Sequence, residues 1–214
     1  MSIILFFGTD YLSGTRNIRT QQFTELGEYL MSNIATPATI EASPAASQPL
    51  LQAVKKLIGS VPNLFRMVGN SPAALEGYLG LNGALAKGKL DAKTRERIAL
   101  AVAEINGCDY CLAAHTYMGK NLAKLDDVEI AANRHGTSSD VKADAAVRFA
   151  AKITTSRGHV SLQDLQATKN AGFSDAEIVE IISHVALNTL TNYVNNVTGT
   201  DIDFPAVAAA KKAA

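Results

Sequence analysis

The sequence predicts an all-α domain built from antiparallel helical hairpins. From Leu50 onward, apolar residues recur at helix spacing in successive short segments, each bounded by a capping residue, a glycine or a proline. No run of residues alternates apolar and polar side chains between turn signals as a strand would, apart from the short run at residues 3–7. Short turns between successive helices favour antiparallel neighbours.

The first 49 residues differ in character from the rest of the chain. They show no sustained helical period, and the stretch from Ala35 to Pro49 is rich in Ala, Thr, Ser and Pro. This composition predicts an N-terminal arm and linker over residues 1–49, poorly structured as a whole. Met31 directly precedes the linker, so we also consider that translation starts there and that residues 1–30 are an upstream extension. The intact mass of the natively expressed protein tests this hypothesis.

The helical domain is predicted over residues 50–205. Apolar side chains three or four residues apart lie on one face of a helix, where they can be buried together. Ser, Asp and Pro mark the expected helix starts, because their side chains or fixed φ suit a first turn, and Gly or Pro marks the ends. These signals delimit helical segments at residues 50–61, 63–68, 72–87, 92–103, 108–120, 126–133, 140–156, 161–171 and 174–196.

Two of these segments carry further information. The run from Ile98 to Ala103 is apolar on nearly all sides, which predicts a central position in the fold. The last long helix opens with Ser174 and Glu177 in a Ser-x-x-Glu capping box. We interpret its polar stripe as hydrogen bonding in the core or at a subunit contact, with pocket lining as the alternative; the stripe comprises His184, Asn188, Asn192 and Asn195. Residues 206–214 are predicted to be a helix-prone C-terminal tail that frays.

The two cysteines of the chain, Cys108 and Cys111, form a Cys-x-x-Cys motif, and His115 follows four residues after the second. In a helix over residues 108–120, these three side chains fall within an arc of about 60°. Asn106-Gly107 breaks the preceding helix, so Cys108 lies in a first turn, where free N–H groups favour a thiolate. The closer spacing to the imidazole favours Cys111 instead. Spacing alone therefore leaves the order of the two thiols open.

Glu96, on the preceding helix, is the predicted third participant. By the 100° rule it shares a face with small and apolar positions, namely Ala99, Leu100, Ala103 and Gly107. A carboxylate on such a face requires a partner, and pairing with His115 would raise the basicity of the histidine and fix its tautomer. The alternative is an ordinary exposed carboxylate beside Arg95 and Arg97.

Composition narrows the function class. Lys+Arg and Asp+Glu both number 20, so no net field favours a nucleic acid or an anionic membrane as a partner. The apolar run at residues 3–7 is too short for a signal-peptide core, and no segment has membrane-spanning length, so we expect a cytoplasmic protein. In a reducing compartment, Cys-x-x-Cys indicates redox or metal chemistry. Structural zinc requires four ligands, and no second Cys/His pair stands at suitable spacing, which favours the redox interpretation.

The full motif, Glu-x11-Cys-x-x-Cys-x3-His, resembles the signature of AhpD-like alkylhydroperoxidases of the carboxymuconolactone decarboxylase superfamily, and it comprises Glu96, Cys108, Cys111 and His115. The resemblance covers about residues 50–200. Its segments Asn63–Arg66 and Asn188–Asn196 look like the peroxidase-related branch. The resemblance implies an all-helical homotrimer or homohexamer that reduces hydroperoxides without metal, haem or another cofactor.

The resemblance also implies roles for the motif residues. Cys111 would be the peroxidatic thiol that is oxidised to sulfenic acid, and Cys108 its proton donor and resolving partner, with a Cys108–Cys111 disulfide as product. Glu96 and His115 would form the proton relay. A dithiol of thioredoxin or lipoyl type would reduce the disulfide.

One position departs from the pattern. The best-known alkylhydroperoxidase of the family has a histidine between its cysteines, whereas this chain has Tyr110, expected as a pocket wall or as a hydrogen-bond donor to the substrate. Two alternative functions stand beside peroxide reduction. A decarboxylase-like lyase would require His115 and Glu96 but survive loss of both thiols, and a non-catalytic redox-sensing oligomer would change its packing with the disulfide.

Overall fold

A computed structural model of the chain describes residues 33–210. The chain divides between Leu30 and Met31, and the predictions for residues 1–30 lie outside the described part. All regular elements of the described residues are helical, which confirms the predicted all-α class. In chain order they are η1 (Ala45–Ser47), α1 (Gln48–Ile58), α2 (Asn63–Val68), α3 (Pro72–Leu85), α4 (Ala92–Ile105), α5 (Asp109–Asn121), α6 (Asp127–Arg134), α7 (Val141–Ser156), α8 (Leu162–Asn170) and α9 (Asp175–Thr198).

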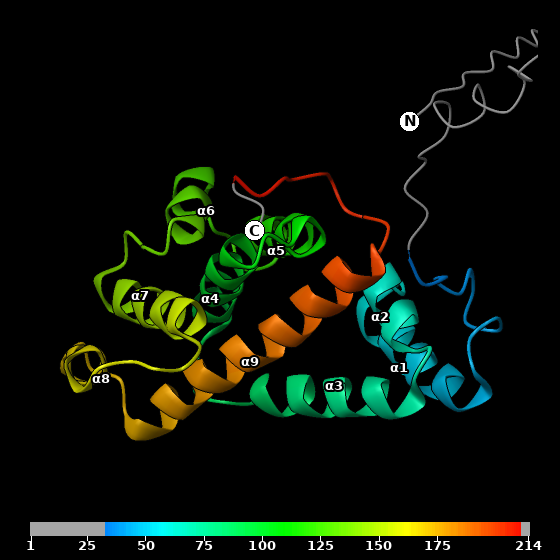
Figure 1. Cartoon of the computed structure of the whole chain (residues 1–214), viewed down its shortest axis with the longest axis horizontal. Helices are drawn as coiled ribbons and strands as arrows, with labels where there is room; N and C mark the ends of the chain where they lie inside the picture. The colour runs from blue at the N-terminus through cyan, green and yellow to red at the C-terminus, as the bar shows by residue number, and fades with distance from the viewer. Residues whose placement is uncertain (1–32, 211–214) are drawn as a thin grey trace, which may run out of the picture. The chain divides into compact units, whose positions relative to one another are not determined.

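Helix α4 lies at the centre of the domain, as its apolar run predicts. It contacts α5, α6, α7 and α9, and residues 98–103 are all buried. The long helix α9 crosses the middle of Figure 1, with α1, α2 and α3 on one side and α6, α7 and α8 on the other. Helices α4 and α5 form an antiparallel pair against α9, so residues of these three helices meet in the interior.

The helix starts follow the local signals of the sequence. Asp91 accepts a hydrogen bond from the backbone N–H of Thr94 and caps α4. Ser174 and Glu177 form both bonds of the predicted capping box at the start of α9. Side-chain caps satisfy N–H groups that have no partner inside the helix, and each contributes about 1 kcal/mol. These caps define where α4 and α9 begin and therefore which faces they present to each other.

The segment before α1 lies on the helical domain. Ser47 is buried and donates to the carbonyl oxygen of Gly69 at 2.7 Å. Arg66 donates to the carbonyl oxygen of Ala38 at 3.0 Å, and Asn33 donates to that of Val197 at 2.9 Å. The described part of the predicted linker is therefore joined by hydrogen bonds to α2 and to the end of α9.

The C-terminal segment 201–210 follows α9 without regular helix, so the expectation of a helix-prone tail is wrong for its described residues. The backbone N–H of Ala209 donates to the Asp109 carboxylate at 2.8 Å, and that of Ala210 donates to Glu104 at 2.7 Å. The carboxylates of Glu104 and Asp109, at the junction of α4 and α5, thus accept hydrogen bonds from backbone N–H groups that would bond within the C-terminal segment if it were helical. Tertiary hydrogen bonds override the local helix propensity of alanine in this segment.

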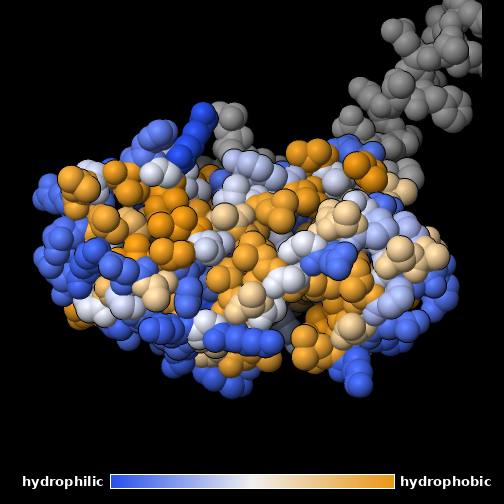
Figure 2. Space-filling model, turned by 90° about the horizontal axis from the view of Figure 1, so that it is seen from below, coloured by the Kyte–Doolittle hydropathy of each residue, from blue (hydrophilic) through white to orange (hydrophobic). Residues whose placement is uncertain are grey.

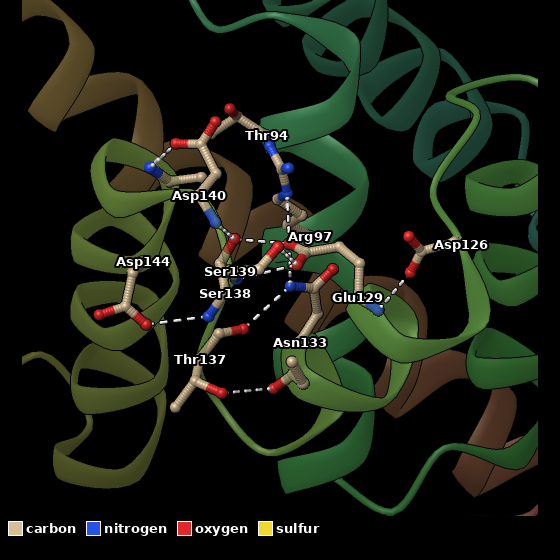
Figure 3. A network of polar contacts seen from close by, with 12 residues as sticks. Thr94, Arg97, Asp126, Glu129, Asn133, Thr137, Ser138, Ser139, Asp140 and Asp144 are labelled. Carbon is tan, nitrogen blue, oxygen red and sulfur yellow. Dashed lines mark hydrogen bonds and ion pairs between the residues drawn. The ribbon is translucent and has the colours of Figure 1, made fainter.

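A buried polar network joins α4 to α6 and to the loop before α7 (Figure 3). Glu129 accepts hydrogen bonds from Arg97 Nε at 2.7 Å, Asn133 Nδ2 at 2.9 Å and the backbone N–H of Ser139 at 2.9 Å. The hydroxyl groups of Ser138 and Ser139 also donate to it. Burial would raise the pKa of Glu129, but these bonds lower it to about 2. Because its oxygens are fully engaged, we assign this network to the fixing of α4 rather than to a site.

Candidate active site

A tight turn between α4 and α5 places the two cysteines. Gly107 has a φ of 62°, in the left-handed region that glycine adopts without strain. Cys108 is the N-cap of α5, and its Sγ accepts a hydrogen bond from the backbone N–H of Cys111 at 3.3 Å. Both cysteines are buried and both are free thiols. The predicted placement of Cys108 at a helix start is confirmed, with its side chain serving as the cap.

The structure brings Glu96 and His115 together, as the helical spacing predicts. His115 Nδ1 lies 2.8 Å from Glu96 Oε2, and the two side chains are only 18% and 21% exposed. Burial alone would lower the pKa of His115, but the charge and the hydrogen bond of Glu96 raise it overall. The Cys111 thiolate and a hydrogen bond to Asn188 raise it further. The pair therefore favours a protonated imidazole beside Cys111.

Helix α9 supplies polar side chains to the same place. Asn195 Nδ2 donates to Cys111 Sγ at 3.3 Å, and Asn192 Oδ1 accepts from Asn106 Nδ2 at 2.8 Å. Farther along the helix lies His184, whose pKa is lowered to about 4 by burial and then by the charge of Arg95. The stripe that the sequence assigns to the core or to a pocket thus faces the thiols, the carboxylate and the imidazole.

These neighbours act on the two thiols in opposite directions. Burial would raise the pKa of Cys111, but the hydrogen bond from Cys108, the charge of His115 and the amides of Asn195 and Asn192 lower it to about 7. The pKa of Cys108 is raised well above its usual range, first by its hydrogen bond to Cys111 and then by burial. These directions favour the thiolate at Cys111 over one at Cys108, whereas the backbone N–H of Cys111, which donates to Cys108 Sγ, acts the other way. The order of the two thiols that spacing leaves open stays a prediction, and the contact of Asn195 with Cys111 Sγ supports Cys111.

The fold and the sequence both have known counterparts. Residues 72–156 match the carboxymuconolactone decarboxylase family. The chain resembles the crystal structure of an alkylhydroperoxidase AhpD core, an uncharacterized peroxidase-related protein from Ralstonia eutropha JMP134, with a TM-score of 0.71 and 26% identity over 80% of this chain and 92% of that one. The fold is therefore AhpD-like, and residues 72–156 belong to the carboxymuconolactone decarboxylase family.

Other relatives of this AhpD-like chain agree in fold. An uncharacterized peroxidase-related protein from Silicibacter sp. TM1040 has a TM-score of 0.69 and 24% identity, over 79% of this chain and 91% of that one. The debrominase Bmp8, solved with 2,3,4-tribromopyrrole, has a TM-score of 0.68 and 20% identity, over 81% of this chain and 93% of that one. An uncharacterized protein of Haemophilus influenzae is 44% identical over 63 residues, which span 29% of this chain and half of the relative. The fold therefore occurs with more than one kind of chemistry.

Tyr110 of the AhpD-like chain is buried and fully hydrogen-bonded. Its hydroxyl donates to Asp203 Oδ1 at 2.8 Å and accepts from the backbone N–H of Leu64 at 3.1 Å. Its ring meets Phe204 edge to face, with ring centroids 5.9 Å apart. Burial first and the Asp203 charge second raise its pKa, although the Leu64 bond opposes them. Tyr110 thus anchors the C-terminal segment, and its expected contact with a substrate remains a prediction.

The sequence interpretation did not include three residues of this neighbourhood: Tyr78, Asp203 and Phe204. Burial first, then the negative charges of Cys111 and Glu96, raise the pKa of Tyr78, so its phenol lies near both groups. Asp203 and Phe204 come from the C-terminal segment, which carries no local motif. The periodicity of α3 marks Tyr78 as an inward-facing residue but contains no signal of its neighbours.

An apolar cavity of about 270 Å³ lies between α2, α3 and α9. Val68, Tyr78 and Leu190 are among its lining residues. Tyr78 lines this cavity and is also the residue whose pKa the charges of Cys111 and Glu96 raise, so the cavity shares one residue with the neighbourhood of the cysteines. A second, polar hollow of about 220 Å³ between α4, α7 and the start of α9 is lined by charges of both signs, including Arg97 and Glu177.

Residues 33–210 contain neither a membrane-spanning helix nor a cluster of metal ligands. No helix there is both long and apolar enough to cross a membrane. Nor are three or more His, Cys, Asp or Glu side chains of this part of the chain grouped as ligands of a metal ion.

Proposed function

We propose that the chain is a cysteine-dependent peroxidase that reduces hydroperoxides by means of Cys111 and Cys108. The observation that carries the proposal is the geometry around the two buried thiols: Asn195 Nδ2 donates to Cys111 Sγ at 3.3 Å, and Cys108 is the N-cap residue of the same helix. The directions of the two pKa shifts, lowered at Cys111 and raised at Cys108, agree with a thiolate at Cys111 beside a thiol at Cys108. A peroxide needs both a thiolate to attack one oxygen and an acid to protonate the other. Both groups stand within one helical turn.

The proposed reaction has two steps. The Cys111 thiolate attacks the terminal oxygen of ROOH, the O–O bond breaks, and the Cys108 thiol protonates the leaving RO⁻ to give ROH. Cys111 is then a sulfenic acid and Cys108 a thiolate. The Cys108 thiolate attacks the Cys111 sulfur, the S–O bond breaks, and the departing hydroxide takes the proton of the His115 imidazolium and leaves as water. Glu96 stabilises that imidazolium until the proton is used.

The cycle closes with an external dithiol of thioredoxin or lipoyl type, which we include in the proposal. One of its thiolates attacks the Cys108–Cys111 disulfide, and its second thiol resolves the mixed disulfide. The reductant is oxidised to its own disulfide and its two protons return to the protein. The start of α5 lies beside the C-terminal segment, whose Phe204 packs on Tyr110 and Tyr117.

The organic group of the hydroperoxide would occupy the apolar cavity beside Tyr78. A Cβ added at Gly77, in the cavity wall, meets no atom within 4 Å, so Gly77→Leu should fill the space without displacing the backbone. This variant is expected to slow oxidation by cumene hydroperoxide more than oxidation by hydrogen peroxide. Equal rates with both peroxides would remove the cavity from the proposal.

The main test is stopped-flow oxidation of the reduced protein by several hydroperoxides, with thiols counted before and after. Two thiols lost and one disulfide formed are expected. Cys111→Ser should abolish turnover, and Cys108→Ser should stall after one oxidation with a sulfenic acid that dimedone traps. Undiminished peroxidase activity in Cys111→Ser ends the proposal, and a lyase activity that survives loss of both thiols would replace it.

We also propose that the protein forms a homo-oligomer through the outer face of α9. By the 100° rule, five exposed apolar residues of this helix lie within an arc of about 80°, along its whole length. They are Val179, Ile182, Leu190, Tyr193 and Val197. Figure 2 shows hydrophobic patches on the face of the molecule seen from below. Sedimentation should give a trimer or hexamer, and Tyr193→Glu should release smaller species; a wild-type monomer would contradict this.

A further inference from the structure

Helix α9 has its polar stripe inside and its apolar stripe outside. By the 100° rule the two stripes lie on opposite sides of the helix. All four members of the inner stripe are buried, with Asn192 0% exposed; they are His184, Asn188, Asn192 and Asn195. A surface helix normally turns its apolar face inward because burial of polar groups costs free energy. The burial of the polar stripe of α9 therefore requires an explanation, and the cysteine site that the stripe faces is the place to look for it.

The interactions of Asn195 and Asn188 with the site explain part of this burial. Asn195 donates to Cys111 Sγ at 3.3 Å, and hydrogen bonding to Asn188 raises the pKa of His115. Asn188 Nδ2 also donates to the carbonyl oxygen of His184 at 2.8 Å, inside α9 itself. One member of the stripe therefore contacts the thiol directly, and a second acts on the pKa of the imidazole.

Three buried polar atoms of this stripe have no hydrogen-bond partner, namely His184 Nε2, Asn192 Nδ2 and Asn195 Oδ1. Two of them belong to the residues nearest the cysteines: Asn192 Nδ2 is a donor and Asn195 Oδ1 is an acceptor. An unpartnered buried polar group lowers the stability of the fold, so proteins retain few of them. Asn192 acts on Cys111, since its amide contributes to the lowered pKa of that thiol, and Asn195 Oδ1 belongs to the amide that contacts the sulfur. A free donor and a free acceptor therefore lie close to the reacting sulfur.

This pair matches the group that oxidation creates. A sulfenic acid adds one hydroxyl to sulfur, and a hydroxyl is one hydrogen-bond donor and one acceptor. We propose that Asn192 and Asn195 are catalytic residues: Asn195 Nδ2 holds the Cys111 sulfur, Asn192 Nδ2 donates to the oxygen that the sulfur takes from the hydroperoxide, and Asn195 Oδ1 accepts the sulfenic O–H. The inference rests on the proposed function and names two residues that the motif does not contain.

The proposed bonds act where charge moves. As the S–O bond forms and the O–O bond breaks, negative charge leaves the Cys111 sulfur and spreads over the two peroxide oxygens. Donors held in place before the reaction stabilise such charge without reorganisation. Asn106 accounts for this placement, because its Nδ2 holds Asn192 Oδ1 at 2.8 Å and so orients the free Nδ2. The overall stoichiometry of the two thiols and one hydroperoxide is unchanged.

Several titratable groups face Cys111 and must be separated from the asparagines in any test. Cys108 and His115 come from α5 and its cap, Glu96 from α4 and Tyr78 from α3, whereas the amides come from α9. Replacement of an amide by an isosteric carboxylate changes the α9 side alone. It also turns a donor into a charged acceptor beside the thiolate.

The experiment compares Asn192→Ala and Asn195→Asp with the full-length wild type. Asn195→Asp is expected to raise the pKa of Cys111, read from thiolate absorbance near 240 nm, and to slow alkylation by iodoacetamide at neutral pH at least tenfold. Asn192→Ala should slow alkylation by only about twofold to threefold, because its amide is one of several groups that lower the pKa of Cys111. It should slow oxidation by hydrogen peroxide about tenfold more than it slows alkylation, the loss of one transition-state hydrogen bond. Asn82→Asp, which makes the same change at an exposed position of α3, should change neither rate by more than about twofold.

The outcomes distinguish a failure of the proposed peroxidase function from a failure of the roles given to Asn192 and Asn195. A purely structural role predicts that Asn192→Ala lowers the thermal unfolding midpoint while both rates stay at the wild-type value, and this result overturns the inference. Unchanged thiol pKa in Asn195→Asp, in a protein whose circular dichroism matches wild type, overturns it as well. A wild type that no hydroperoxide oxidises overturns the proposed function first, and with it the role of Asn192. An active wild type with slowed variants supports both.

Discussion

Substitution of Glu96 by Gln tests the proton relay most directly. The carboxylate lies 2.8 Å from His115 Nδ1, and the two side chains are about one-fifth exposed, so solvent screens the pair only in part. Gln keeps an oxygen that accepts the Nδ1 hydrogen bond and removes the negative charge. The variant therefore isolates the electrostatic contribution of Glu96 from its packing.

The size of the effect follows from the difference between two kinds of hydrogen bond. A bond between charged groups contributes about 1.5–3 kcal/mol and a neutral one about 0.5–1.5 kcal/mol, so the loss is about 1–1.5 kcal/mol. At about 1.4 kcal/mol per pKa unit, the pKa of His115 should fall by about one unit. Because the imidazolium charge lowers the pKa of Cys111, that pKa should rise in the variant.

The sign for stability follows from the same shift. The pKa of His115 is raised in the folded protein, so its contribution to the free energy of unfolding is complete below the unfolded value and is lost as pH rises through the folded one. In Glu96→Gln this contribution should be smaller and should be lost at lower pH. The wild type is expected to hold a protonated His115 over the wider pH range.

The assay is a titration of the His115 ring protons by NMR, with iodoacetamide alkylation of Cys111 followed over about pH 5–9. Near pH 6, alkylation should slow up to about tenfold. Glu76→Gln, an exposed carboxylate on α3, is the matched control and should leave both curves unchanged. An unchanged or higher pKa for His115 in Glu96→Gln would refute the argument that Glu96 sets its charge.

Three further predictions concern the scaffold. The pKa of Glu129 is lowered to about 2, so its contribution to stability is present above about pH 4.5 and should be lost as pH falls toward 2, by about 3 kcal/mol in urea unfolding at a series of pH values. Asp203→Ala, which removes a charged acceptor from Tyr110, should destabilise the fold by about 2 kcal/mol and speed hydrogen exchange in residues 201–210. Gly80→Ala should stabilise α3 by about 0.5–1 kcal/mol, because a Cβ there meets no atom within 4 Å.

Each of these three predictions has a second variant for comparison. Glu129→Gln should flatten the acid dependence, and a wild type whose stability is constant down to pH 2 would contradict the network argument. Asp201→Ala alters an exposed neighbour of Asp203 and should leave exchange unchanged. Gly88→Ala should destabilise, because its Cβ would lie 2.6 Å from a Glu180 oxygen that accepts backbone N–H groups; a stabilised Gly88→Ala would count against the steric argument.

Local signals in the sequence were sufficient for the order of the helices and for most of their ends. Helix α1 is an exception, because it begins at Gln48 and ends at Ile58, before Gly59, rather than running from residue 50 to 61. Ser174 and Glu177 form their capping box whatever the helix packs against, because the bonds close within one turn. The pairing of Glu96 with His115 was also predictable, since two adjacent helices joined by a tight Gly107 turn leave few partners for an inward carboxylate. The motif in these helices was enough to recognise the family.

Only the tertiary structure decided which groups surround each sulfur and what the α9 stripe faces. The pKa of Cys111 depends on Asn195, 84 residues away in sequence, and that of Tyr110 on Asp203, 93 residues away. Periodicity places Asn192 and Asn195 on one side of a helix but contains no information on what lies opposite. Desolvation and hydrogen bonding act over a few ångströms in space, so the sequence by itself determined the chemical groups, and the packing of α4, α5 and α9 decided which of them act on one another.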